Sequence, residues 1–158
     1  MTPAAPQPRE DGRQSQTARA VQRGVLRHLA ARGLVGVTEF CLVSGRRADI
    51  LAVDGRGEVS IVEIKSSVQD FRTDLKWPEY RAFCDRLLFA VPLDFPAEIL
   101  PDETGLLVAD AFGAELLRAA PLHPLAAATR KALMLRFAHT AASRLAALYD
   151  PDLARYSL

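Results

Sequence analysis

Three charged residues lie within segments that are otherwise apolar. Asp49 lies within Ala48–Val53, and Glu63 and Lys65 lie within Ile61–Lys65. A charge in a buried strand is costly unless it is paired or bound to a metal. Because side chains alternate across a strand, Glu63 and Lys65 project from the same face. These residues are therefore candidates for a chemical site rather than for core packing.

The turn between the two segments decides whether Asp49 and Glu63 meet. A three-residue loop, Gly55–Gly57, with Gly57 in the left-handed conformation, would pair the strands so that Asp49 lies directly opposite Glu63. Directly opposed Cβ atoms are about 5 Å apart. Two carboxylates at that separation repel each other unless a divalent cation lies between them.

Oxygen ligands without histidine or thiolate select a hard ion, so the expected cofactor is Mg²⁺ or Mn²⁺. We expect Asp49, Glu63 and the backbone carbonyl of Ile64 to hold it. Such an ion polarises a phosphodiester and lowers the pKa of a bound water. Lys65 would orient that water or neutralise charge in the transition state. The reaction class predicted is metal-assisted phosphodiester hydrolysis.

A sheet flanked by helices must position these residues. Apolar spacing, glycine turns and capping residues predict, in chain order, a helix over 17–32, strands over 34–43, 48–53 and 58–65, a helix from Ser67 to about Lys76, a kink or new helical start at Pro78 that continues to Cys84, strands over 87–91, 106–109 and 114–118, and a long helix from His123 to about Tyr149. The predicted fold class is α/β, a mixed β-sheet with an antiparallel three-strand meander flanked by helices, plus a long C-terminal helix.

Composition limits the function classes. A chain of 158 residues that is 49% hydrophobic predicts one domain over 16–158, preceded by a flexible tail over 1–15 that is rich in proline and glutamine. A net charge of +1 excludes a basic field over the whole molecule, so contact with nucleic acid requires a local patch. We expect a soluble cytoplasmic protein with no membrane partner, since no apolar run approaches the ~18 residues of a membrane span and no signal peptide is apparent.

The acidic residues and the lysine resemble the motif of a known nuclease superfamily. Asp49 followed by Glu63-Ile64-Lys65, on two strands that precede a helix, is similar to the PD-(D/E)XK nucleases. Their core order of helix, three-strand meander, helix and strand matches residues from about Thr17 to Val91. The resemblance implies a restriction-endonuclease-like core with Asp49, Glu63 and Lys65 as catalytic residues.

A closer likeness is to the MmcB family of bacterial DNA-repair proteins. The matching motifs are Glu39-Phe40, Gly45 to Asp49, Val62 to Ser67, Asp74-x-Lys76-Trp77-Pro78, Cys84-Asp85, Phe89 to Pro92, Gly105-Leu106, Ala109-Asp110 and Arg130 to Leu133. This resemblance covers most of the chain beyond the tail, and it implies a role in the repair of DNA damage.

The first predicted helix departs from the superfamily pattern. Many members carry a further acid there, but this helix has none between Thr17 and Arg32. Glu39, in the first strand, is the candidate replacement as a metal ligand if its register with Asp49 is also even. The alternative interpretation of Glu39 is an exposed strand residue.

Basic residues near the motif are candidates for contact with DNA. Arg46 and Arg47 lie in a turn beside Asp49, where they could hold phosphates or be solvated. Lys76-x-x-x-Tyr80 is similar to the Gln-x-x-x-Tyr of exonuclease-type relatives, which implies contact of both residues with backbone phosphate. The expected partner is damaged, branched or single-stranded DNA.

Three functional hypotheses follow. The first is a DNA-repair nuclease that requires Mg²⁺ or Mn²⁺, and the alternative is a catalytically inactive, nuclease-like DNA-binding or scaffold protein. The third makes the segment over 125–148 a partner-binding helix, unless its apolar stripe is buried within the monomer. That stripe comprises Leu133, Phe137, Ala141, Leu145 and Leu148. The oligomeric state stays open, with a homodimer as one arrangement.

Overall fold

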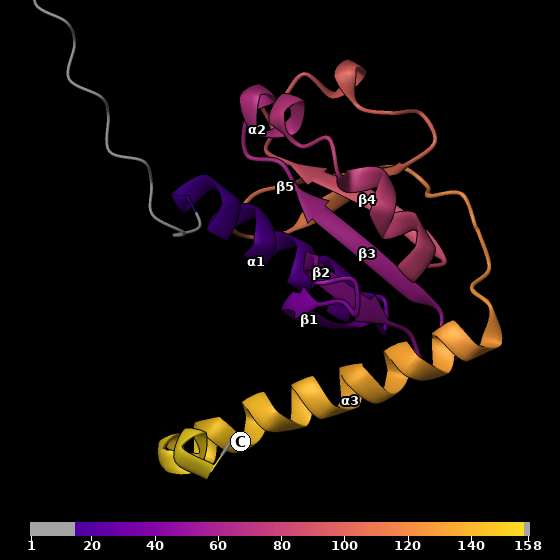
Figure 1. The fold of residues 1–158 in the computed structure, drawn as a ribbon. Coiled ribbons are helices and arrows are strands. Elements are labelled where there is room, and N and C mark those ends of the chain that lie inside the picture. The colour runs from indigo at the N-terminus through magenta and orange to yellow at the C-terminus, as the bar shows by residue number, and fades with distance from the viewer. Residues whose placement is uncertain (1–14, 157–158) are drawn as a thin grey trace, which may run out of the picture.

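The computed structural model describes residues 15–156, so the predicted tail lies outside the described residues apart from Ser15 (Figure 1). The elements are α1 (Gln16–Ala31), β1 (Val35–Cys41), β2 (Arg47–Val53), β3 (Val59–Ile64), α2 (Val68–Thr73), the 3₁₀ helix η1 (Trp77–Phe83), β4 (Arg86–Val91), the short η2 (Ala97–Ile99), β5 (Gly105–Ala109), β6 (Ala114–Arg118), α3 (Ala127–Tyr149) and η3 (Pro151–Tyr156). This order of helices and strands confirms the predicted α/β class.

All six strands form one sheet, in the order β1-β2-β3-β4-β5-β6. β1, β2 and β3 are antiparallel, which confirms the three-strand meander. β4 pairs in parallel with both β3 and β5, and β6 returns antiparallel to β5. The sheet is therefore mixed, as predicted, and β3 lies inside it with every residue buried.

Alternating side chains give the sheet two packed faces. On one face, Ile50, Val62 and Ala90 pack against the apolar stripe of α1. On the other, Leu51 and Ile61 belong to a core that includes buried residues of η1 and α3. Figure 1 shows α1 and α3 on separate sides of the meander, with α2 beyond the end of β3. Among residues 15–156, no helix is both long enough and apolar enough to cross a membrane.

Two predicted helix boundaries are wrong. The helix that starts after Ser67 ends at Thr73 rather than near Lys76, because the carboxylate of Asp74 accepts the Lys76 N–H and the chain leaves the helix there. A new helical segment then starts beside Pro78, as predicted. α3 starts at Ala127 rather than at His123, whose N–H is held by the carbonyl of Asp85.

One buried carboxylate fastens α3 to the sheet. Asp85, at the start of β4, accepts two hydrogen bonds of 2.7 Å from the guanidinium of Arg130. It also accepts the backbone N–H groups of Val59 and Leu125, at 2.7 and 2.8 Å. Burial alone would raise the pKa of Asp85, but the Arg130 guanidinium and these N–H groups together lower it to about 2. The N-terminal end of α3 is therefore held by a charged, fully bonded contact.

α1 is held against the turn between β5 and β6 by a close backbone approach. A Cβ atom on Gly24 would lie 2.0 Å from the carbonyl oxygen of Asp110 and 2.4 Å from that of Gly113. Backbone atoms cannot yield at those distances, so only glycine fits here. By contrast, a Cβ atom on Gly55 would meet nothing within 4 Å.

We predict that Gly24→Ala destabilises the protein although alanine favours helices. The forced shift of α1 should lower the free energy of unfolding by about 2 kcal/mol or more. Chemical denaturation measures the effect, and Gly55→Ala, within about 0.5 kcal/mol of wild type, is the matched control. Equal stability of the two variants would contradict the packing of α1 described above.

Candidate functional site

The predicted register of β2 and β3 is confirmed. Gly57 has φ = +87° in the connecting turn. The pairs of the ladder run from Val53↔Val59 to Ile50↔Val62, so the next residues along, Asp49 and Glu63, are opposite each other. The site therefore lies at the end of the hairpin that is farthest from its turn.

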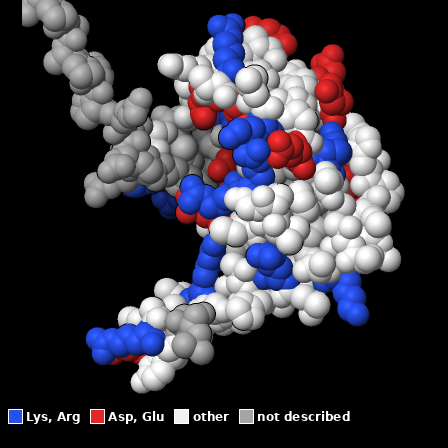
Figure 2. Space-filling model, in the orientation of Figure 1, with Lys and Arg blue, Asp and Glu red and all other residues white. Residues whose placement is uncertain are grey.

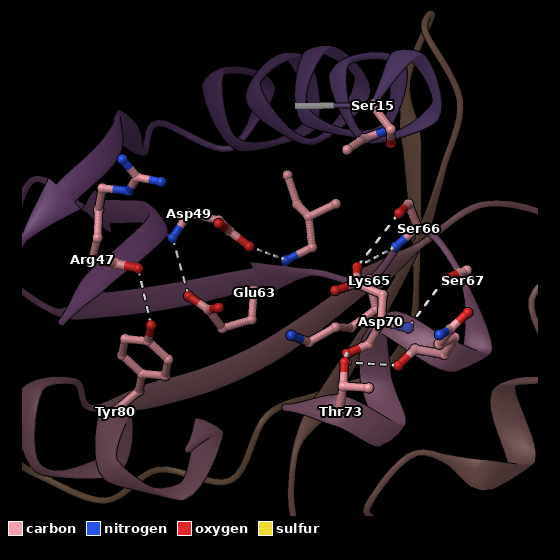
Figure 3. A pocket seen from close by; sticks show the side chains of 13 residues that line it. Ser15, Arg47, Asp49, Glu63, Lys65, Ser66, Ser67, Asp70, Thr73 and Tyr80 are labelled. Carbon is pink, nitrogen blue, oxygen red and sulfur yellow. Dashed lines mark hydrogen bonds between the residues drawn. The ribbon is translucent and has the colours of Figure 1, made fainter. Parts of the chain in front are cut away.

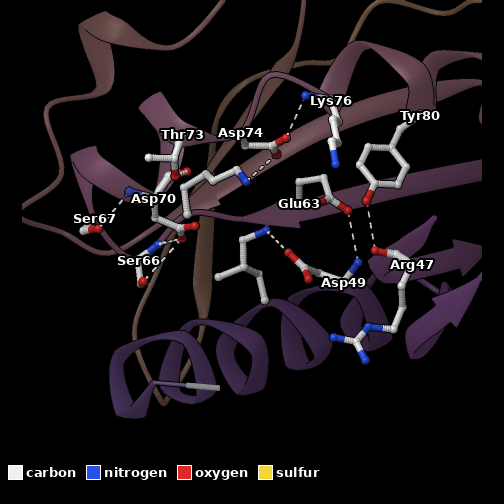
Figure 4. Close-up of polar contacts among 12 residues, drawn as sticks. Arg47, Asp49, Glu63, Ser66, Ser67, Asp70, Thr73, Asp74, Lys76 and Tyr80 are labelled. Carbon is white, nitrogen blue, oxygen red and sulfur yellow. Dashed lines mark hydrogen bonds and ion pairs between the residues drawn. The ribbon is translucent and has the colours of Figure 1, made fainter. Parts of the chain in front are cut away.

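At this point the two strands exchange side-chain bonds instead of ladder bonds (Figure 4). The N–H of Asp49 donates to Oε1 of Glu63 at 3.0 Å. The N–H of Ile64 donates to Oδ2 of Asp49 at 2.7 Å. Each carboxylate is thus oriented by the backbone of the other strand, and one oxygen of each is used.

In both carboxyl groups the ionised form is disfavoured, because their pKa values are raised. Burial is the main cause, followed by the charge of Asp49, and together they raise the pKa of Glu63 to about 9. Burial also raises the pKa of Asp49, against the opposing effects of the Ile64 N–H and Lys65. Two adjacent carboxyl groups that resist ionisation would be stabilised in their charged form by a cation.

Lys65 lies at the same site but has a carboxylate of its own. Its Nζ is 2.6 Å from Oδ2 of Asp74, and the two side chains are only 6% and 19% exposed. Burial opposes ionisation of Asp74, but the Lys65 ammonium and the N–H of Lys76 lower its pKa overall. Lys65 is therefore a fixed, buried cation whose position depends on Asp74.

Asp49, Glu63 and Lys65 all line one cavity of about 980 Å³. Its walls come from the N-terminal turn of α1 at Ser15 and Ala18, from the ends of β2 and β3, and from α2 (Figure 3). The α1 wall carries no acid in its first turn. Within the described residues, the first turn of α1 therefore contributes no carboxylate to this wall.

Only some of the basic residues predicted to contact DNA line the cavity. Arg47 lines the cavity. Arg46 does not line it, and its guanidinium instead bonds both carboxylate oxygens of Glu79, at 2.7 and 3.2 Å. The side chain of Lys76 is exposed and extends toward Glu63 in Figure 4.

Tyr80 lines the cavity, but its hydroxyl is already used in a hydrogen bond to the backbone of β2. Its hydroxyl donates to the carbonyl of Arg47 at 2.9 Å, and the residue is 7% exposed. Burial and the nearby carboxylates raise its pKa. Its observed contact therefore holds the start of β2 in place, and contact with phosphate stays a prediction.

Glu39 meets the register condition but does not line the cavity. The flanking pairs of β1 and β2 put it opposite Asp49. Its backbone, however, has φ = +49°, and its carboxylate lies 3.8 Å from Arg47 at the surface. Within residues 15–156, no group of three or more acidic, histidine or cysteine side chains is placed to share a metal. A role for Glu39 as a ligand stays a prediction.

Two acids were not singled out from the sequence. Asp74 holds Lys65, and Asp70 lines the cavity with its carboxylate on the N–H of Ser66 at 3.0 Å. Neither acid was assigned a role from the sequence, and Asp74 entered only as part of the motif shared with the MmcB family. The available signal was the motif Asp74-x-Lys76, where an acid lies beside the predicted end of a helix that follows a buried lysine.

We predict that the Lys65–Asp74 pair is far more important for stability than the surface pair Arg46–Glu79. Asp74→Ala leaves a buried ammonium without its partner and should lower the free energy of unfolding by about 3 kcal/mol. Glu79→Ala, in a pair whose side chains are 31% and 54% exposed, should cost much less, because solvent screens an exposed ion pair. Urea denaturation of both variants checks this. Equal losses would mean that Lys65 does not depend on Asp74.

We also predict a pH-dependent effect of Glu63→Gln in metal-free buffer. With a pKa raised from 4.5 to about 9, folded Glu63 retains a proton that the unfolded chain has already lost. Stability must therefore fall as the pH rises between those values. Glutamine removes this titration, so the variant should exceed wild type by at least about 1 kcal/mol at pH 8 and match it near pH 4. Denaturation curves at both pH values test this, with exposed Glu98→Gln as a control that leaves the pH slope unchanged.

Comparisons with known proteins give a family and a similar structure. A sequence profile described as DNA repair protein MmcB-like matches residues 5–152. A solved structure described as SPO1766, a protein of unknown function from Silicibacter pomeroyi, is 48% identical, with a TM-score of 0.84 over 87% of this chain and 94% of that one. A comparison with curated proteins finds no match. Because the profile spans nearly the whole chain, this protein belongs to the MmcB-like family of DNA repair proteins.

Proposed function

We propose that this DNA-repair protein is a metal-dependent nuclease of the PD-(D/E)XK type that hydrolyses DNA phosphodiester bonds. One observation carries the proposal. Asp49 and Glu63 lie side by side at the end of the β2–β3 ladder, bonded to each other's strands, with Lys65 in the same cavity. Membership of a DNA-repair family supports DNA as the partner.

The donor set suits a hard cation. Asp49 and Glu63 are the residues that would hold Mg²⁺ or Mn²⁺, together with the backbone carbonyl of Ile64, which also lines the cavity. Mg²⁺ in enzymes is commonly bound through one or two carboxylates and retains several waters. When bound, the ion would supply Lewis-acid polarisation of the phosphodiester and a lowered pKa for a coordinated water.

The other charged residues of the cavity would act on the substrate. Lys65, held in place by Asp74, brings positive charge to the place where a phosphate gains negative charge in the transition state. Arg47, at the cavity wall, and Lys76, exposed beside it, would hold flanking phosphates. Arg46 already neutralises Glu79, so it offers less to DNA. Figure 2 shows acidic and basic side chains mixed over this face, which suggests local contacts rather than a broad basic surface.

A second candidate function is a nuclease-like protein that binds DNA without cutting it. The absence of an acid from the first turn of α1, at the cavity wall, favours this second function. It predicts DNA binding that is sensitive to salt and that survives the loss of Asp49.

Cleavage assays with Mg²⁺ or Mn²⁺ test the nuclease proposal on single-stranded, nicked, flapped and junction DNA. We expect wild type to cut at least one of these, and Asp49→Asn and Glu63→Gln to lose more than about a hundredfold in rate. Glu98→Gln should retain full activity. Calorimetry should show Mn²⁺ binding that Asp49→Asn abolishes. Absence of both cleavage and Mn²⁺ binding would leave the non-catalytic function.

DNA affinity as a function of salt tests the basic residues in either case. Arg47→Ala and Lys76→Ala should each reduce the slope of log K against log[salt] by about 0.9, the value for one phosphate contact with a duplex. Arg56→Ala, in the turn at the opposite end of the β2–β3 hairpin, should leave the slope unchanged. Equal effects at the three positions would mean that DNA does not approach through this cavity.

A further inference from the structure

α3 has two apolar sides, and the protein's own core covers only one of them. On the covered side, Leu133 is buried, and Phe137 and Ala141 pack half-buried against the core beneath β1 and β2. The stripe expected to bind a partner is therefore buried in its first half. Its other members, Leu145 and Leu148, are 54% and 81% exposed.

The uncovered side carries a second stripe with a regular spacing. It consists of Leu135, Ala138, Ala142, Leu145 and Tyr149, all exposed, and it shares Leu145 with the first stripe. Steps of three and four residues in alternation place these side chains along one line of a helix, as in helices that pair with other helices. Leu135 and Tyr149 are 65% and 84% exposed, which is unusual for large apolar groups in such an array.

Contacts on the covered side hold α3 so that this second stripe faces solvent. Arg130 is fixed by Asp85 at the N-terminal end. Arg144, near the other end, donates to the carbonyls of Thr38 and Glu39 on the edge strand β1. Figure 1 shows the C-terminal end of α3, with η3, extending beyond the sheet. Among residues 15–156, every member of the second stripe is exposed.

The lack of charged residues beside the second stripe favours the same surface of a second copy as its partner. The positions that flank it on the helix are Ala132, Met134, His139, Ala141, Ala146 and Leu148. None of them is Lys, Arg, Asp or Glu, so an acidic or basic partner would find little to pair with at the flanks. A second copy of this chain meets no like charge there.

The charges at the two ends set the direction of pairing. Lys131 lies in line with the stripe at its N-terminal end, and Asp150 follows it at the C-terminal end. Antiparallel pairing puts Lys131 of each copy beside Tyr149 and Asp150 of the other, where cation–π and ionic contacts are favourable. Parallel pairing would instead bring Lys131 against Lys131. From these features we propose that α3 pairs with α3 of a second copy in antiparallel orientation, with Leu135 opposite Leu145 and Ala138 opposite Ala142.

Mass measurement tests the dimer. Sedimentation or light scattering of the full chain at high micromolar concentration should give twice the 17.3 kDa of one chain. Leu145→Glu, which puts a carboxylate into the stripe, should give the single mass. Leu93→Glu, at a residue 75% exposed in the loop after β4, should remain dimeric. Ala138→Glu tests the same stripe from a second position, and circular dichroism confirms folding. A monomeric wild type, or dimeric Leu145→Glu and Ala138→Glu variants, would overturn the proposal.

Disulfide trapping tests the register, in a Cys41→Ser background because Cys41 is exposed. Ala138→Cys and Ala142→Cys are prepared separately, mixed and oxidised. Since disulfides require Cα atoms within about 7 Å, the antiparallel register predicts a covalent dimer that joins one variant to the other. Each variant oxidised alone should crosslink much less. Efficient crosslinking of each variant alone, with none between them, would overturn the antiparallel arrangement.

Discussion

The exchange of bonds between Asp49 and Glu63 decides where β2 and β3 stop forming a regular ladder. In an uninterrupted hairpin, the N–H groups of Asp49 and Ile64 would bond to carbonyls or to water. Here each bonds to a carboxylate of the opposite strand. Two acidic side chains therefore lie side by side at the end of the β2–β3 ladder, and they line the cavity that opens there. Residues of the first turn of α1 and of α2, among them Gln69, Asp70 and Thr73, line that opening.

The balance of charge around this opening is uneven. Lys65 is neutralised by Asp74, and Arg46 by Glu79. Asp49 and Glu63, by contrast, lie beside each other with hydrogen bonds from backbone N–H groups. Burial raises the pKa of both groups, so their protonated forms are favoured. If these positions served only for packing, apolar residues would make the fold more stable than two buried acids do. This arrangement supports the proposal that a cation from solution would neutralise the two acids.

Turn length and side-chain alternation were enough to predict much of this fold from the sequence. The length of the turn at Gly57 and the alternation of side chains correctly placed Asp49 opposite Glu63. An even register was not enough for Glu39. Its φ is positive, and its neighbours Val37 and Phe40 both pack into the core that includes α3. The contact between Asp85 and Arg130 could not be foreseen either. It joins groups 45 residues apart, and neither spacing nor propensity encodes which distant partner a carboxylate finds.

Asp85 also links the fold to the order in which the chain is made. Its guanidinium partner, Arg130, lies 45 residues further along the sequence. A ribosome therefore releases the complete sheet before the helix that neutralises this buried acid. Until that helix arrives, the nascent domain carries an unpaired charge and an uncovered apolar face. Truncated chains that end after β6 would keep both defects, which makes them natural targets for chaperones and proteases.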